Sequence, residues 1–138
     1  MASISAALRH RVMQRARYCC EYCLEPNELS FYPHEIDHIA AEKHGGSSDD
    51  KNLACACWRR NRYKGSDLTS FDLDTGNIVR LFNPRTQDWY EHFTLDGPRI
   101  VPLSPEARAT AVLLHYNTPE RVAERAAMIR KGQYPPRH

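Results

Sequence analysis

The pair Asp37-His38 holds the residue types in this chain best suited to chemistry. If the backbone there is extended, neighbouring side chains point to opposite sides, so Asp37 can face a metal ion while His38 faces a water molecule. Histidine has an unperturbed pKa of about 6.5, so its neutral form can accept a proton from water. Asn61 offers a neutral oxygen beside the anionic Asp37, and two oxygen ligands suit a hard cation such as Mg²⁺. The pattern is typical of metal-assisted phosphodiester hydrolysis.

The chain has five cysteines, an odd number that is bunched rather than spread along the sequence. They are Cys19, Cys20, Cys23, Cys55 and Cys57. Two clusters of this kind favour metal binding in a reducing compartment over a disulfide framework. We therefore expect a cytoplasmic location.

The composition of the 138 residues is that of a globular protein, with 41% hydrophobic and 26% charged residues. No stretch approaches the roughly 20 apolar residues that span a membrane. The net charge of +2 does not by itself indicate a nucleic-acid partner, so the distribution of charge along the sequence is the more informative property. Basic residues form two patches around the candidate site, although each patch could equally be a solvated helix face. The patches are Arg9, Arg11, Arg15 and Arg17, and Arg59, Arg60, Arg62 and Lys64.

The first 65 residues are expected to form a helix, a turn and a strand, loop, strand, helix unit. The opening helix begins at Ser3 or Ser5, either of which can cap it, and ends near Arg17. A CxxC turn follows at residues 20–23, with strands at 35–39 and 52–57 around a Gly-rich loop. A helix is predicted over 58–64, because Gly65 stands where a C-cap would.

The remaining residues, 66–138, are expected to be a companion subdomain of a single domain that covers 1–138. Residues 71–81 and 93–101 each read as two strands around a polar turn. Two helices follow, starting at Pro105 and Pro119 behind capping hydroxyls and running to about residues 116 and 131. The predicted fold class is α+β.

The run from Cys20 to Gly65 resembles the HNH endonuclease family, whose motif reads CxxC, Asp-His, Asn-Leu, a second Cys pair with Asn or His, and Lys-Gly. The matching residues are Cys20, Cys23, Asp37-His38, Asn52-Leu53, Cys57, Asn61 and Lys64-Gly65. Several fixed residues in order over about 45 positions make this likeness specific. The Arg-rich opening and the tail, with Leu81–Arg85, Trp89, His92-Phe93 and Gly97, resemble a bacterial HNH subgroup.

The resemblance implies a ββα-metal core with an N-terminal helix, short β-hairpins and two C-terminal helices. In that core His38 is the general base, and Asp37 and Asn61 hold one catalytic divalent metal, Mg²⁺ or Mn²⁺. Asn52 fixes the loop that orients His38, although spacing alone does not separate such an amide from an ordinary turn residue.

Three cations fit contacts with DNA phosphates, which supply affinity that depends on salt and not on sequence. They are Arg59, Arg62 and Lys64. Each of them could equally be a solvated cation.

The sequence departs from the family at Arg60, which stands where the second CxxC would place its last cysteine. A guanidinium cannot coordinate a cation, so a structural zinc site built on Cys20, Cys23 and Cys57 lacks a ligand. Cys55 is the nearest substitute, since residues two apart in a strand face the same way; it could instead be a small buried apolar residue. We expect a lost or weakened zinc site.

The sequence therefore predicts a metal-dependent endonuclease that cleaves DNA with little sequence preference, because nothing in it resembles a base-reading helix. A second hypothesis is a nucleic-acid-binding module that kept the fold and lost turnover, for which the missing cysteine is the support. A third is a protein-interaction or effector domain that uses the downstream helices. The oligomeric state is left open.

Overall fold

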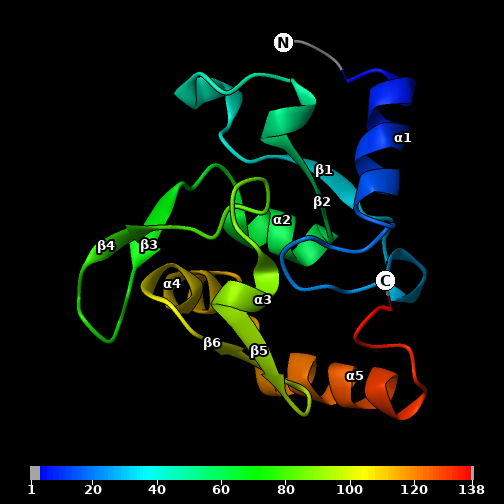
Figure 1. Cartoon of the computed structure of the whole chain (residues 1–138), viewed down its shortest axis with the longest axis vertical. Coiled ribbons are helices and arrows are strands. Elements are labelled where there is room, and N and C mark those ends of the chain that lie inside the picture. Colours follow the sequence, from blue (N-terminus) through cyan, green and yellow to red (C-terminus); the bar gives the residue numbers. More distant parts are fainter. Residues whose placement is uncertain (1–3, 138) are drawn as a thin grey trace. The chain divides into compact units, whose positions relative to one another are not determined.

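The computed structural model of the chain describes residues 4–137 and contains two compact units, residues 1–67 and 68–138. The elements of both units are labelled in Figure 1. Short antiparallel hairpins and helices make up each unit, so the α+β class is confirmed. The prediction that 1–138 form one domain stays a prediction. Among the described residues no helix combines the length and the apolar character that a membrane crossing needs.

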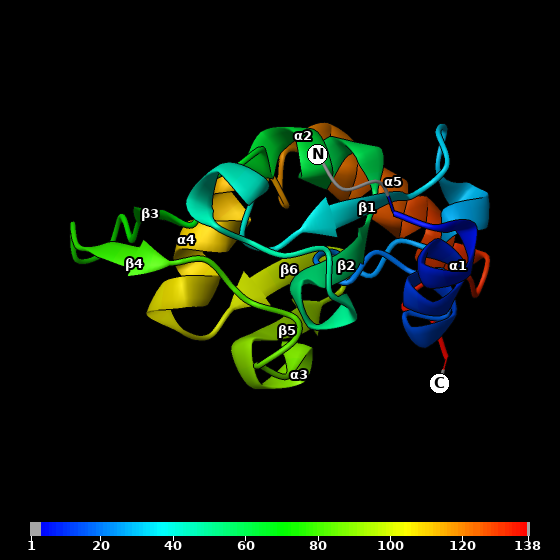
Figure 2. The same ribbon diagram turned by 90° about the horizontal axis from the view of Figure 1, so that it is seen from above.

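The first unit is a β-hairpin with a helix on each side. In order, its regular elements are α1 (Ala6–Arg15), β1 (Glu35–His38), β2 (Leu53–Ala56) and α2 (Trp58–Lys64). Three short 3-10 helices cover Asn27–Leu29, Glu42–His44 and Asp50–Asn52. Both α1 and α2 contact β1, and in both views the hairpin lies between them (Figures 1 and 2).

Burial of the hairpin follows from this placement. All four residues of β2 are buried, whereas Asp37 is the one buried residue of β1. The antiparallel register pairs Asp37 with Ala54 and His38 with Leu53. A strand buried on both faces reads as a continuous run of small and apolar residues, as 53–56 does.

The helices of this unit begin and end where the sequence provides signals. The hydroxyl of Ser5 accepts a hydrogen bond from the amide of Leu8 at 3.1 Å, so Ser5 caps α1; the alternative cap, Ser3, lies outside the described residues. Helix α1 ends at Arg15, two residues before the expected end. Helix α2 has the predicted bounds, and Gly65 follows it with a φ of +52°, a conformation that favours glycine.

The second unit contains two hairpins and three helices. Its elements are β3 (Thr69–Phe71), β4 (Ile78–Arg80), α3 (Trp89–His92), β5 (Phe93–Asp96), β6 (Arg99–Pro102), α4 (Pro105–Leu113) and α5 (Pro119–Arg130). Phe93 is fully buried at its centre, stacked on Trp89 and in contact with the rings of Phe82 and Tyr116. The short helix α3, which the sequence did not predict, brings Trp89 onto Phe93.

The first hairpin of this unit corrects the expectation for residues 71–81. Its first strand ends at Phe71 rather than continuing beyond it, because Asp72 turns inward. The Asp72 carboxylate accepts two hydrogen bonds from Arg108, each 2.8 Å long, and one from the Thr75 hydroxyl at 3.0 Å. The paired Arg108 holds the pKa of Asp72 well below the usual value of a carboxyl group.

This pairing predicts an acid-dependent loss of stability. A carboxyl group whose pKa is lower in the folded state stabilises the protein at pH values above its unfolded pKa of about 4, and the benefit is lost as the pH falls further. We expect Asp72→Asn to melt several degrees below the wild type at pH 7, with a difference that shrinks in acid. Thermal unfolding followed by circular dichroism from pH 7 to 3, with the exposed Asp96→Asn as control, measures this. A difference that stays constant with pH would contradict the pairing.

Candidate active site

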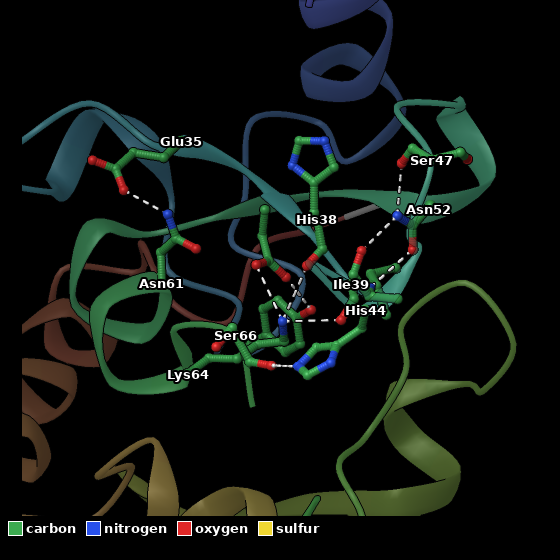
Figure 3. Close-up of polar contacts among 12 residues, drawn as sticks. Glu35, His38, Ile39, His44, Ser47, Asn52, Asn61, Lys64 and Ser66 are labelled. Carbon is green, nitrogen blue, oxygen red and sulfur yellow. Dashed lines mark hydrogen bonds and ion pairs between the residues drawn. The ribbon is translucent and has the colours of Figure 1, made fainter. Parts of the chain in front are cut away.

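Strand β1 divides its side chains between two environments. Asp37 is only 3% exposed and faces α2, whereas His38 is partly exposed beside the loop that joins the two strands. The pleat of an extended chain produces this alternation. The side chains of Asp37 and His38 are therefore adjacent in sequence but have different partners, and Figure 3 shows the His38 ring pointing away from Lys64.

The Asp37 carboxylate takes part in a buried polar network. Its Oδ2 accepts a hydrogen bond from the Tyr22 hydroxyl at 2.6 Å, and its Oδ1 pairs with Lys64 Nζ at 3.2 Å. Lys64 Nζ also donates to the carbonyl oxygens of His38 at 3.2 Å and Ile39 at 3.1 Å (Figure 3). An ammonium group has three protons, and this arrangement supplies an acceptor for each.

The protonation of Asp37 is set by competing effects. Burial raises the pKa of the carboxyl group above its ordinary value, and the Lys64 charge and the Tyr22 hydrogen bond oppose that rise. A carboxylate has about four lone-pair positions, of which these two partners use two. The group therefore keeps capacity for a cation, although Lys64 already sits against one of its oxygens.

Asn61 projects from α2 toward the same face of β1. Its Nδ2 donates to Glu35 Oε1 at 2.7 Å, so its amide oxygen is the atom left to act as a ligand (Figure 3). Glu35 and Asp37 are two residues apart on β1, and Asn61 and Lys64 are three apart on α2. The two elements therefore meet through two pairs, Glu35 with Asn61 and Asp37 with Lys64. Glu35 was not predicted as a site residue, although its position two residues before Asp37 in a strand could have suggested it.

His38 lies against polar groups of the loop between the strands. Its Nε2 is 3.1 Å from the Ser48 hydroxyl and 3.8 Å from the Glu42 carboxylate. With Nε2 unprotonated, the hydroxyl donates to the ring; once the ring is protonated, the carboxylate can stabilise the positive charge. Ser48 and Glu42 are site residues that the sequence did not single out.

Asn52 holds that loop in shape. Its side-chain oxygen accepts from the amide of Ala40 at 2.9 Å, and its Nδ2 donates to the carbonyls of Ala40 at 2.9 Å and Ser47 at 2.7 Å. Gly46 passes so close that an added Cβ would lie 1.7 Å from the Ala40 oxygen. The loop therefore needs the amide at 52 and a glycine at 46, and it carries the groups that contact His38.

Three cysteines lie together at the other end of the hairpin. Cys20, Cys23 and Cys57 are buried, with their sulfur atoms within 4.8 Å of one another and Sγ of Cys23 3.8 Å from that of Cys57. Hydrogen bonds from Cys20 and Cys57, together with the Arg60 charge, lower the pKa of Cys23 well below that of an ordinary thiol. Such a group of sulfur atoms could bind a metal such as zinc.

The structure contradicts the idea that Cys55 completes this site. Cys55 lies within β2 and is not among the cysteines whose sulfur atoms lie within 4.8 Å of one another. Burial raises the pKa of the Cys55 thiol to about 12, as expected for a buried neutral group. Arg60, one turn along α2 from Cys57, is buried and places its charge near the thiols instead.

The predicted basic patch on α2 is smaller than the sequence suggested. Lys64 and Arg60 are buried, so a phosphate contact by Lys64 would require its pair with Asp37 to open. Arg62 is exposed and Arg59 partly so, and their guanidinium carbons lie 5.9 and 5.2 Å from the centre of the Trp58 ring.

Restoring a thiol at position 60 tests the cysteine cluster. We expect Arg60→Cys to retain about one zinc ion per chain under conditions in which the wild type loses it, because zinc prefers four Cys or His ligands. The test is the zinc content of each protein, measured by atomic absorption after dialysis against a weak chelator. Arg60→Gln is the control, because it removes the charge without adding a ligand. Equal zinc content in the two variants would show that position 60 does not face the cluster.

Comparison with known families agrees with this geometry. Residues 20–67 match the family model described as HNH endonuclease. No curated protein and no solved structure matches the chain. The matched segment contains the cysteine cluster, the β1–β2 hairpin and α2, and so every predicted site residue. Residues 20–67 of this chain are therefore similar to the HNH endonuclease family.

Proposed function

We propose that the chain is a metal-dependent endonuclease that hydrolyses DNA phosphodiester bonds with little sequence preference, with His38 as the general base. The observation that carries this proposal is the separation of side chains along β1. His38 lies beside Ser48 of the loop, whereas Asp37 and Glu35 face α2, where Lys64 contacts the first and Asn61 the second. A base and an oxygen ligand set on adjacent residues match what hydrolysis requires.

His38 takes the proton from the attacking water. A neutral imidazole nitrogen can accept a proton, and the Ser48 hydroxyl holds the ring in place at 3.1 Å. The imidazolium that forms is stabilised by the Glu42 carboxylate, 3.8 Å from Nε2. Asn52 acts indirectly, because its three hydrogen bonds hold the loop that carries these two groups.

Asp37 and Asn61 are the residues that would hold a divalent cation, Mg²⁺ or Mn²⁺. Carboxylate and amide oxygens are the ligands that such hard ions prefer, and each of the two side chains has an oxygen with lone pairs to spare. When bound, the ion supplies positive charge for the phosphate and the leaving oxygen. Lys64 keeps its two backbone acceptors if the carboxylate turns to a cation, so the pair can open without leaving the ammonium group alone.

Exposed arginines supply the contacts to DNA. Arg62 on α2 and Arg9 on α1 are exposed, and both line one pocket of the first unit. Phosphate contacts of this kind give affinity without sequence information, which fits cleavage at many sites. The cysteine cluster holds zinc weakly, because it has three ligands rather than four, and the five free thiols of the chain suit a cytoplasmic location.

One observation favours a second candidate function. The Asp37 carboxylate is paired with Lys64 in a buried position, which competes with a metal ion. A chain in which that pair never opens would be a DNA-binding module with the HNH fold and without turnover.

The proposal is tested on supercoiled plasmid with Mg²⁺, Mn²⁺ or EDTA. We expect metal-dependent nicking by the wild type and a loss of about 10²–10⁴-fold in His38→Ala, because the general base is gone. The exposed His10→Ala is the matched control and should cleave normally. Anisotropy of a labelled duplex should show unchanged DNA binding in His38→Ala.

Two results would count against this proposal. Normal cleavage by His38→Ala would remove the assigned base. Binding without cleavage by the wild type, with every metal, would favour the module without turnover.

A further inference from the structure

The first unit contains a pocket that the nuclease chemistry leaves unused. It has a volume of about 520 Å³, within the range of small-molecule sites. Its walls come from α1, the segment before β1, β1 itself and the start of α2. They include Arg9, Tyr32, His34, Glu35, Trp58 and Arg62.

One wall of the pocket is aromatic and exposed. The rings of Tyr32 and Trp58 meet edge to face with their centres 4.9 Å apart, and Phe31 continues the row, 4.8 Å from Tyr32. Phe31 is 81% exposed and Tyr32 is 49% exposed. Large apolar rings that stay in water on the surface mark a binding surface when they cluster. Flat rings offer stacking faces that any nucleobase can use.

The pocket is also lined by positively charged side chains. Arg9 is held by a hydrogen bond of 3.2 Å to the carbonyl of His34, which fixes it at the pocket. Arg62 lies over the Trp58 ring. Guanidinium groups beside aromatic rings combine phosphate binding with stacking, which is the combination that single-stranded nucleic acids require.

The pocket is joined directly to the candidate metal ligands. Glu35 lines it and accepts the hydrogen bond of Asn61 at 2.7 Å. Its carboxylate has further lone pairs that can accept from the amino group of a base. A nucleotide in the pocket would therefore lie beside the residues proposed to hold the catalytic cation.

We propose that this pocket binds an unpaired nucleobase of the DNA substrate, stacked on the aromatic wall with its phosphates against Arg9 and Arg62. The inference rests on the proposed function. It adds a substrate class to that function, namely DNA with an unpaired nucleotide near the cleaved bond. Perfectly paired duplex places its bases out of reach of the aromatic wall and binds through phosphate contacts alone.

Three labelled two-stranded DNA duplexes test this by anisotropy, in a His38→Ala background that keeps the DNA intact. One is fully paired, one has a single-nucleotide bulge, and one has an abasic bulge. We expect the bulged duplex to bind about tenfold more tightly than the other two, because stacking contributes about 1–3 kcal/mol per base, where about 1.4 kcal/mol is tenfold. Tyr32→Leu and Trp58→Leu should lose this preference and keep their affinity for the paired duplex, whereas Tyr90→Leu, an exposed tyrosine of the second unit, should change neither.

A second measurement does not depend on the folding of those variants. In a Trp89→Phe protein the remaining tryptophan is Trp58, and its fluorescence should fall on addition of the bulged duplex but not of the abasic one. Equal affinity for all three duplexes, or a preference that survives in both leucine variants, would overturn the pocket assignment. If plasmid is still cleaved in that case, the proposed nuclease stands without the pocket. Failure to bind any duplex would overturn both.

Discussion

The ion pair between Asp37 and Lys64 is the interaction on which the candidate site depends. Each side chain is 3% exposed, and burying two charges costs free energy that is recovered only with good geometry and further hydrogen bonds. The site supplies them, because Tyr22 donates to the second carboxylate oxygen and two backbone carbonyls accept from the ammonium group. Those carbonyls belong to His38 and Ile39, so the pair also fixes the end of β1 and the start of the loop.

The alternation of side chains along β1 separates the functions around this pair. Asp37 and Glu35 face α2 and pair with Lys64 and Asn61, whereas His38 lies against Ser48 and Glu42 of the loop. The loop in turn is held by the amide of residue 52 and by a close backbone approach that only glycine at 46 allows. Metal ligands and base are therefore positioned by different supports, helix α2 for the first and the loop for the second.

Features that depend on local sequence could be predicted. Helix α2 has its expected bounds because Gly65 supplies a positive φ, and the hairpin follows from the alternation before the Gly-rich loop. Features that depend on distant partners could not. Lys64 was expected on the surface, yet its burial results from a carboxylate 27 positions away. The pairing of Glu35 with Asn61 and the separation of Cys55 from the cysteine cluster likewise depend on how β1, β2 and α2 pack.

The most direct test of the candidate site is whether Asp37 and Asn61 bind a divalent cation. Titration of the protein with Mn²⁺, followed by the loss of the free-ion EPR signal, measures binding without relying on catalysis. We expect about one Mn²⁺ site per chain, greatly weakened in both Asp37→Asn and Asn61→Ala and unchanged in Asp96→Asn, whose carboxylate is exposed in the second unit. Wild-type Mn²⁺ affinity in the first two variants, with folding verified by circular dichroism, would contradict it.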